Sequence, residues 1–163
     1  MDKINKNIEL GDLFELETDK GNRIYFQCVQ MPTDVRNEVE LVKVFYNLYS
    51  KTPSDLCSVV EGDFFFNRFP LKTATRKKII RKIGNCPLPD NFEAPLYYRT
   101  ENPFGEGWQI INAENLKRET IQELSEKQKK LSPWGSMNDT MIIELLEKGW
   151  NLENWTLHNR FPE

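Results

Sequence analysis

The sequence predicts an α+β protein, with an antiparallel sheet in the first half of the chain and helices in the last third. Apolar and polar residues alternate along several short segments before residue 70, which is typical of strands. Beyond residue 116, apolar residues recur every three to five positions, which is typical of amphipathic helices. Because 163 residues suit one domain, we expect a single unit with a sheet-rich part (8–70), a helix and proline-rich connection (73–95), and strands and helices (96–163).

The first two strands are expected to form a hairpin. Phe14, Leu16 and Thr18 share one face of a strand. Residues 19–22 (Asp-Lys-Gly-Asn) tolerate a positive φ and suit the turn. Both faces of the returning strand, 23–31, are apolar, so we expect it to be central. Further strands are expected at 39–48, 57–60 and 64–67, the last two joined by a hairpin around 61–63, all in an SH3-like or barrel-like sheet.

The middle of the chain is expected to change from sheet to helix. Thr73 or Thr75 can cap a short helix. The helix buries isoleucines between positions 79 and 83, and Gly84 stands where a helix commonly ends. A proline-rich connection follows, and the chain then has two short strands, 96–99 and 108–112, around a loop rich in glycine and proline.

The C-terminal third is expected to form two amphipathic helices. The first covers 116–131, where glutamates and lysines fill the outer face, and Pro133 follows its end. The second begins near Ser136, buries a stripe that starts at Met141, and ends at Gly149. The residues beyond, 150–161, are expected to form a strand or an ordered tail.

Charge and hydropathy exclude several classes of protein. The net charge is −3, so the chain has no overall attraction for nucleic acid. No apolar run approaches the roughly 18 residues that a membrane span needs, and the first ten residues hold no apolar stretch typical of a signal peptide. Three cysteines (Cys28, Cys57 and Cys86) form no C-x-x-C pair. We therefore expect a cytoplasmic protein with free thiols, in preference to one with a disulfide.

The sequence offers no organised set of catalytic residues. His158 is the single histidine and lies close to the C-terminus, which makes it a poor candidate for a catalytic base. Gly105 and Gly107 lack the third glycine of a dinucleotide-binding loop. We therefore expect no enzyme, no catalytic residue, no cofactor and no metal. The alternative is a small hydrolase whose carboxylates converge in the fold, with Glu61/Asp63 and Asp90/Glu93 as candidate pairs.

One segment is strongly basic. Residues 68–82 hold seven lysines and arginines and no acidic residue. On the expected helix, Arg76, Lys77, Arg81 and Lys82 would form a positive outer face, which could bind phosphate in a nucleic-acid-binding or regulatory module. The preferred interpretation is a solvated helix whose charges the acidic remainder of the chain balances, and nucleic acid is then no partner.

Aromatic residues mark a second candidate surface. Tyr97 and Tyr98 are consecutive, so on a strand they point to opposite faces and one should be exposed. Phe104 and Trp108 lie nearby on the Gly/Pro loop, and tyrosine and tryptophan are enriched among the residues that dominate protein interfaces. The candidate partner-binding residues are therefore Tyr97, Tyr98, Phe104 and Trp108. The alternative is that Trp108 and one of the tyrosines belong to the core.

The first half of the chain resembles Immunity protein 26, a family from bacterial polymorphic toxin systems. The resemblance lies in glycines, prolines and aromatic residues: Gly11-Asp12-Leu13-Phe14, the hairpin into Arg23-Ile24-Tyr25-Phe26, the strand Val42-Lys43-Val44-Phe45, and Ile83-Gly84 followed by Pro87-Leu88-Pro89. It covers about half of the chain, and residues 96–163 have no counterpart in it. The family has a tryptophan shortly before the Ile-Gly step, where this chain has residues 76–82.

The resemblance implies a cytoplasmic α+β protein that is not an enzyme. Such a protein binds a cognate toxin domain, often a nuclease, and blocks it by covering it. A mildly acidic surface suits a basic partner, because complementary potentials raise the association rate. The sequence therefore predicts an immunity-type binding protein whose partner is a toxin protein and not a membrane.

Overall fold

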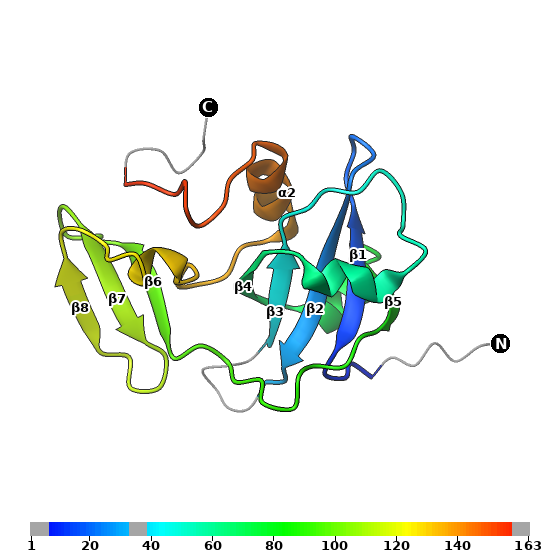
Figure 1. The fold of residues 1–163 in the computed structure, drawn as a ribbon, viewed down its shortest axis with the longest axis horizontal. Coiled ribbons are helices and arrows are strands. Elements are labelled where there is room, and N and C mark those ends of the chain that lie inside the picture. The colour runs from blue at the N-terminus through cyan, green and yellow to red at the C-terminus, as the bar shows by residue number, and fades with distance from the viewer. Residues whose placement is uncertain (1–6, 33–38, 158–163) are drawn as a thin grey trace.

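Two antiparallel sheets make up most of the structure, a computed structural model that describes residues 7–32 and 39–157 (Figure 1). The larger sheet has five strands in the order β4-β3-β2-β1-β5, and the smaller has three in the order β6-β7-β8. Neither sheet closes into a barrel within these residues, so the expected barrel-like form is not seen. The strands of the larger sheet are β1 (Asp12–Glu17), β2 (Arg23–Gln30), β3 (Glu40–Phe45), β4 (Phe64–Phe69) and β5 (Arg81–Asn85).

The β1–β2 hairpin forms as predicted, and β2 is the central strand of its sheet. Leu16 lies opposite Ile24 in the antiparallel register. The turn between the strands closes where Gly21 donates its N–H to the Thr18 carbonyl oxygen at 2.9 Å. Gly21 has a φ of +82°, which only glycine adopts without strain. The prediction of a central strand, made from the apolar residues on both faces of β2, is therefore confirmed.

The helix predicted after Thr73 begins and ends earlier. Helix α1 covers Leu71–Arg76, and Lys78 then takes a left-handed backbone, with a φ of +60°. Ile79 donates its N–H to the Ala74 carbonyl oxygen at 2.9 Å, which ends the helix. The chain continues into β5, which pairs with β1. Arg81 and Lys82 therefore lie on a strand and not on the predicted helix.

The strand predicted at 57–60 is a short 3-10 helix, η1 (Leu56–Glu61). Ser58 turns the chain there, since its N–H and its hydroxyl both donate to the Asp55 carbonyl oxygen. A disulfide joins Cys57 in η1 to Cys86 after β5, which corrects the prediction of free thiols at these two positions. The cysteines meet because η1 packs beside the end of β5, which their spacing in the sequence does not reveal. Cys28 is free and buried, as predicted.

The smaller sheet contains β6 (Tyr97–Glu101), β7 (Trp108–Asn112) and β8 (Arg118–Ile121). The first two confirm the predicted strands, but β8 lies in the segment 116–131 that was expected to be helical. Side chains compete with helix formation there, because Asn112 and Asn115 accept hydrogen bonds from backbone N–H groups between residues 114 and 117. Of the predicted helix only a 3-10 turn remains, η2 (Gln128–Lys130).

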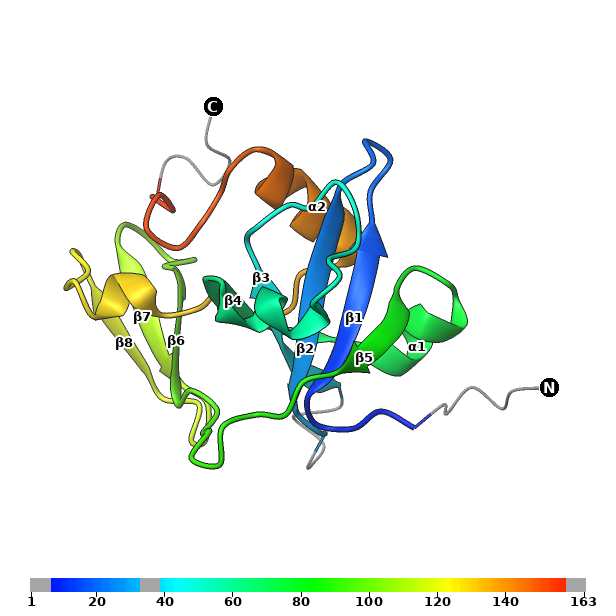
Figure 2. The same cartoon turned by 45° about the vertical axis from the view of Figure 1, so that its right-hand side comes forward.

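Helix α2 (Asp139–Glu147) confirms the last predicted helix, although Asn138 and not Ser136 caps it. The Asn138 side chain accepts a hydrogen bond from the Met141 N–H at 2.8 Å. Ile142, Leu145 and Leu146 pack on the same face of the large sheet as Phe14 and Phe26, and Figure 2 shows α2 lying along β1 and β2. The other face of the sheet holds a smaller apolar cluster, which includes Val59 of η1.

The tail after α2 belongs to the core. Trp150 and Trp155 are both buried, with their ring centroids 6.0 Å apart. Trp150 packs against Phe65 of the large sheet and Trp155 against Trp108 of the small one. The tail therefore joins the two sheets. In the part of the chain that the structure describes, no helix is both long enough and apolar enough to span a membrane. The predicted non-catalytic His158 lies outside the described residues.

Candidate functional site

The four candidate aromatic residues divide between surface and core. Tyr97 and Phe104 are exposed, at 47% and 88%. Tyr98 is buried and packs against Trp134, with their ring centroids 5.7 Å apart. Trp108 is buried against Trp155 at 5.0 Å. Only Tyr97 and Phe104 are therefore available to a partner, and the alternation of β6 explains why its neighbouring tyrosines differ.

Phe104 stands at the tip of the β6–β7 hairpin, in a loop with a defined conformation. The Asn102 side chain accepts a hydrogen bond from the Phe104 N–H at 3.1 Å and donates one to the Glu106 carbonyl oxygen at 3.0 Å. The backbone closes the loop where the Asn102 N–H donates to the Gly107 carbonyl oxygen at 3.0 Å. The loop that carries the exposed Phe104 ring is thus already ordered. Binding through this ring would therefore cost little further conformational entropy, which favours its use as a binding anchor.

The opposite end of the small sheet also exposes apolar side chains. Leu96 and Leu116 are exposed there near Tyr97. The Leu96 carbonyl oxygen accepts from the Ala113 N–H at 2.7 Å, and the Leu116 N–H donates to the Asn112 carbonyl oxygen. Leu116 has a φ of +61°, a conformation that costs a branched residue about 1–3 kcal/mol. No pattern in the sequence indicated this end, because its residues are close only once β6 and β7 pair.

The chain segment that contains the small sheet, 90–126, is predominantly acidic, and three lysines (Lys127, Lys129 and Lys130) follow it. The segment 90–126 contains eight carboxylates and three basic residues, and one of the three, Arg99, is fully buried. None of the eight is buried. This region therefore presents an excess of negative charge together with the exposed rings of Tyr97 and Phe104. We call it the acidic face, and its carboxylates are Asp90, Glu93, Glu101, Glu106, Glu114, Glu119, Glu123 and Glu126.

The predicted phosphate-binding residues do not form one free basic face. Arg81 donates to Glu15 at 2.7 Å, and the Lys82 ammonium lies 3.0 Å from an Asp12 carboxylate oxygen. Both carboxylates are buried, so half of the candidate set stabilises strand β1. Arg76 and Lys77 remain exposed at the end of α1. The strand pairing of β5 with β1 produces this difference from the prediction.

Glu15 accepts hydrogen bonds from several elements. The hydroxyl groups of Thr52 and Tyr25 donate to one carboxylate oxygen at 2.6 and 2.7 Å, and Arg81 donates to the other. Burial raises the pKa of the Glu15 carboxyl, but the hydrogen bonds from Thr52, Tyr25 and Arg81 outweigh burial and hold this pKa below its ordinary value. Burial and the Glu15 charge raise the pKa of the Tyr25 hydroxyl. Every Glu15 oxygen is occupied, so this group stabilises the fold.

Asp12, a second buried acid of β1, is also held by hydrogen bonds within the fold. The Asp12 carboxylate accepts from the Glu9 N–H and from the Asn85 amide. Asp12 and Glu15 lie three residues apart on β1 and so point to opposite faces of the sheet. Within the described residues, no group of three His, Cys, Asp or Glu side chains could hold a metal ion.

Arg99 is a buried residue that the sequence analysis did not identify. It donates to the carbonyl oxygens of Leu131, Lys129 and Leu152, the last at 2.6 Å. Its guanidinium also lies over the rings of Trp108 and Trp155, at 4.7 and 4.2 Å from their centroids. Burial lowers the pKa of Arg99 to about 10. These contacts link β6 to the segment around η2 and to the tail.

Comparison of the chain with models of protein families, with curated proteins and with solved structures finds no match. The similarity to Immunity protein 26 in the first half of the chain therefore stays a prediction.

Proposed function

We propose that this protein binds a partner protein through the acidic face and, as an immunity-type protein, neutralises a cognate toxin by covering it. The observation that carries the proposal is Phe104, which is 88% exposed at the tip of a fixed hairpin, in a chain segment where Glu101 and Glu106 are its nearest acidic neighbours in sequence. Exposed aromatic rings on fixed loops supply large contact areas at low entropic cost. Negative charge around them selects a basic partner, as many nucleases are.

The proposal places the protein in the cytoplasm, where thiols are kept reduced. Cys57 and Cys86 would then be reduced in the cell. The acidic face lies on the small sheet, whereas the disulfide joins η1 to the end of β5. Binding is therefore expected in both redox states.

The test is co-expression with the toxin encoded by the adjacent gene. Wild-type protein should restore growth, and purified protein should bind the toxin domain with and without reductant. The variant Phe104→Ser should weaken binding about tenfold or more, because a buried aromatic anchor contributes at least 1.4 kcal/mol. Leu10→Ser is the matched control, since Leu10 is another exposed apolar residue but precedes β1. Growth arrest that is equal with and without the protein would contradict the proposal.

The nucleic-acid-binding alternative keeps four exposed basic residues of the segment 68–82: Lys72, Arg76, Lys77 and Lys78. Each phosphate contact would steepen the dependence of affinity on salt, with a slope near −0.9 per contact on duplex DNA. Binding to DNA or RNA at low ionic strength that Arg76→Gln and Lys77→Gln reduce would favour this alternative.

A further inference from the structure

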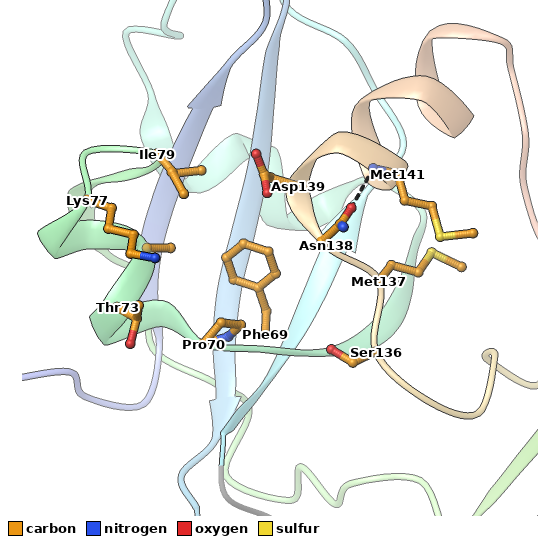
Figure 3. A pocket seen from close by; sticks show the side chains of 11 residues that line it. Phe69, Pro70, Thr73, Lys77, Ile79, Ser136, Met137, Asn138, Asp139 and Met141 are labelled. Carbon is orange, nitrogen blue, oxygen red and sulfur yellow. Dashed lines mark hydrogen bonds between the residues drawn. The ribbon is translucent and has the colours of Figure 1, made fainter.

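A pocket of about 370 Å³ lies between α1 and the start of α2 (Figure 3). Its lining includes the apolar residues Phe69, Ala74, Ile79, Met137 and Met141. The pocket is separate from the acidic face, since its lining comes from the large sheet, α1 and α2. Its volume falls in the range of pockets that take small ligands, roughly 300–1,000 Å³.

Two opposite charges line this apolar pocket. Lys77 reaches toward Phe69 from the α1 side, and Asp139 lies next to the same ring at the start of α2 (Figure 3). Among residues 7–32 and 39–157, neither charged side chain has a hydrogen-bond or ion-pair partner. Asp139 is half-buried, so its carboxylate has lost part of its hydration without gaining a donor from the protein.

The elements that carry these charges are fixed in position. The Asn138 cap sets the start of α2, and the Ser136 hydroxyl donates to the Arg68 carbonyl oxygen at 2.6 Å. On the other side, the Ile79 N–H donates to the Ala74 carbonyl oxygen. Lys77 is thus held in the turn that ends α1. The pocket therefore presents one cationic and one anionic group on separate walls above an apolar floor.

We propose that this pocket binds a zwitterionic ligand with an apolar body, whose ammonium contacts Asp139 and whose carboxylate contacts Lys77. A hydrophobic amino acid and a hydrophobic dipeptide share this chemistry. A dipeptide fills a pocket of this volume better, so it should bind more tightly than the amino acid. Phe69, Ala74 and Ile79 contact the apolar side chains, and each charged end pairs with its counterpart on the wall.

Methionine methyl NMR of the full chain tests the proposal, with leucyl-leucine and leucine as ligands. The methyl signals of Met137 and Met141 should shift on titration, while that of Met31, outside the pocket, should not. N-acetyl-leucyl-leucine lacks the ammonium and leucyl-leucine amide lacks the carboxylate. Each analogue should bind about tenfold more weakly than the dipeptide, the effect of one charged hydrogen bond.

Two variants assign the charged ends. Lys77→Gln should weaken binding of the dipeptide about tenfold and leave binding of its amide unchanged, because the amide has no carboxylate to lose. Asp139→Asn should likewise weaken binding of the dipeptide about tenfold. It should leave binding of N-acetyl-leucyl-leucine unchanged, because that analogue has no ammonium to lose. Lys72→Gln, an exposed lysine on α1 outside the pocket, is the matched control. Because Asp139 also stabilises the first turn of α2, the melting temperature of each variant is measured alongside.

Absence of any methionine shift at about 10 mM ligand, ten times a millimolar Kd, would overturn the proposal. Equal binding of the dipeptide and both blocked analogues would also overturn it, because the pocket would then recognise only apolar surface. Tighter binding of leucine than of the dipeptide would keep the zwitterionic chemistry and assign the site to a free amino acid.

Discussion

At the scale of single residues, the stability of the N-terminal half depends on a few glycines and on one buried carboxylate. Gly11 lies where the chain before β1 passes Cys86, whose N–H donates to the Gly11 carbonyl oxygen at 2.9 Å. Its φ is +87°, and a Cβ atom there would lie 2.6 Å from the Cys86 carbonyl oxygen. Both the backbone conformation and the close approach therefore require glycine.

The comparison of Gly11→Ala with Gly21→Ala separates these two requirements. Gly21 has a similar φ of +82°, but nothing lies within 4 Å of the position of its Cβ. Gly21→Ala should lower the free energy of unfolding by about 1 kcal/mol, the cost of the left-handed backbone. Gly11→Ala should lower it by about 3 kcal/mol, because the alanine also displaces the Cys86 carbonyl. Urea denaturation measures both, and equal losses would contradict the close approach at Gly11.

Glu15 gives the stability of the protein a specific dependence on pH. The folded state holds its pKa below the ordinary value, which the unfolded chain has. The resulting stabilisation is present above the unfolded pKa and is lost as the pH falls through the folded pKa. Glu15→Gln should cost about 2–3 kcal/mol at pH 7, because a buried carboxylate loses its charge-assisted hydrogen bonds, and should cost less at pH 3.

Glu17→Gln is the control for this prediction, because Glu17 lies on the same strand with an exposed side chain. It should change the free energy of unfolding by less than about 0.5 kcal/mol at either pH. A Glu15→Gln deficit of the same size at pH 7 and pH 3 would show that the loss comes from packing and not from the ionised carboxyl.

At the scale of elements, the sequence predicts correctly those helices and strands that are determined by residues close together in the chain. The β1–β2 hairpin, β6, β7 and α2 follow from alternation, a turn glycine and apolar periodicity. The prediction of a helix over 116–131 was wrong. The apolar spacing of this segment fits a helix, but the Leu116 backbone is left-handed and β8 pairs with β7. Periodicity cannot report such pairing, since the partner strand lies elsewhere in the chain.

The candidate sites follow the same rule. The exposure of Tyr97 could be predicted from alternation, because one of two consecutive strand residues faces outward. The engagement of Arg81 and Lys82 with buried carboxylates could not, since it depends on the β1–β5 pairing. The pocket next to Phe69 likewise arises only when α1 and α2 meet.

Arg99 is the side chain that connects the small sheet to the tail, and its removal should release the tail. Arg99→Met should lower the free energy of unfolding by about 3 kcal/mol, because three carbonyl oxygens lose a charged donor. Hydrogen exchange should then speed up at residues 150–157 more than in β1 or β2. Arg118→Met, at an exposed arginine of β8, is the control. Unchanged exchange at 150–157 would mean that the tryptophans alone hold the tail.

At the scale of the whole molecule, charge is divided between two regions. Residues 68–82 contain seven basic residues and no acid, whereas the acidic face at 90–126 has an excess of carboxylates. In the first region, Arg81 and Lys82 form ion pairs with the buried carboxylates of Glu15 and Asp12. Because the net charge is only −3, attraction of a basic partner depends on where the carboxylates lie and not on the total.

This division predicts how the proposed complex forms. Replacing Glu106, Glu114 and Glu119 by glutamine should slow association with the toxin domain about tenfold at low salt and change dissociation little, because exposed charges act mainly on the association rate. The control replaces Asp19, Asp55 and Glu61, which are exposed outside the acidic face, by asparagine or glutamine and changes the net charge equally.

Stopped-flow kinetics at increasing ionic strength distinguishes the two triple variants. The difference between them should disappear near about 0.5 M salt, where the Debye length falls to about 4 Å. Phe104→Ser should show the opposite pattern, with faster dissociation and an association rate close to that of wild type, since the ring acts only after contact. If both triple variants slowed association equally, the net charge and not the acidic face would guide the partner, and the docking surface would have to be sought elsewhere on the molecule.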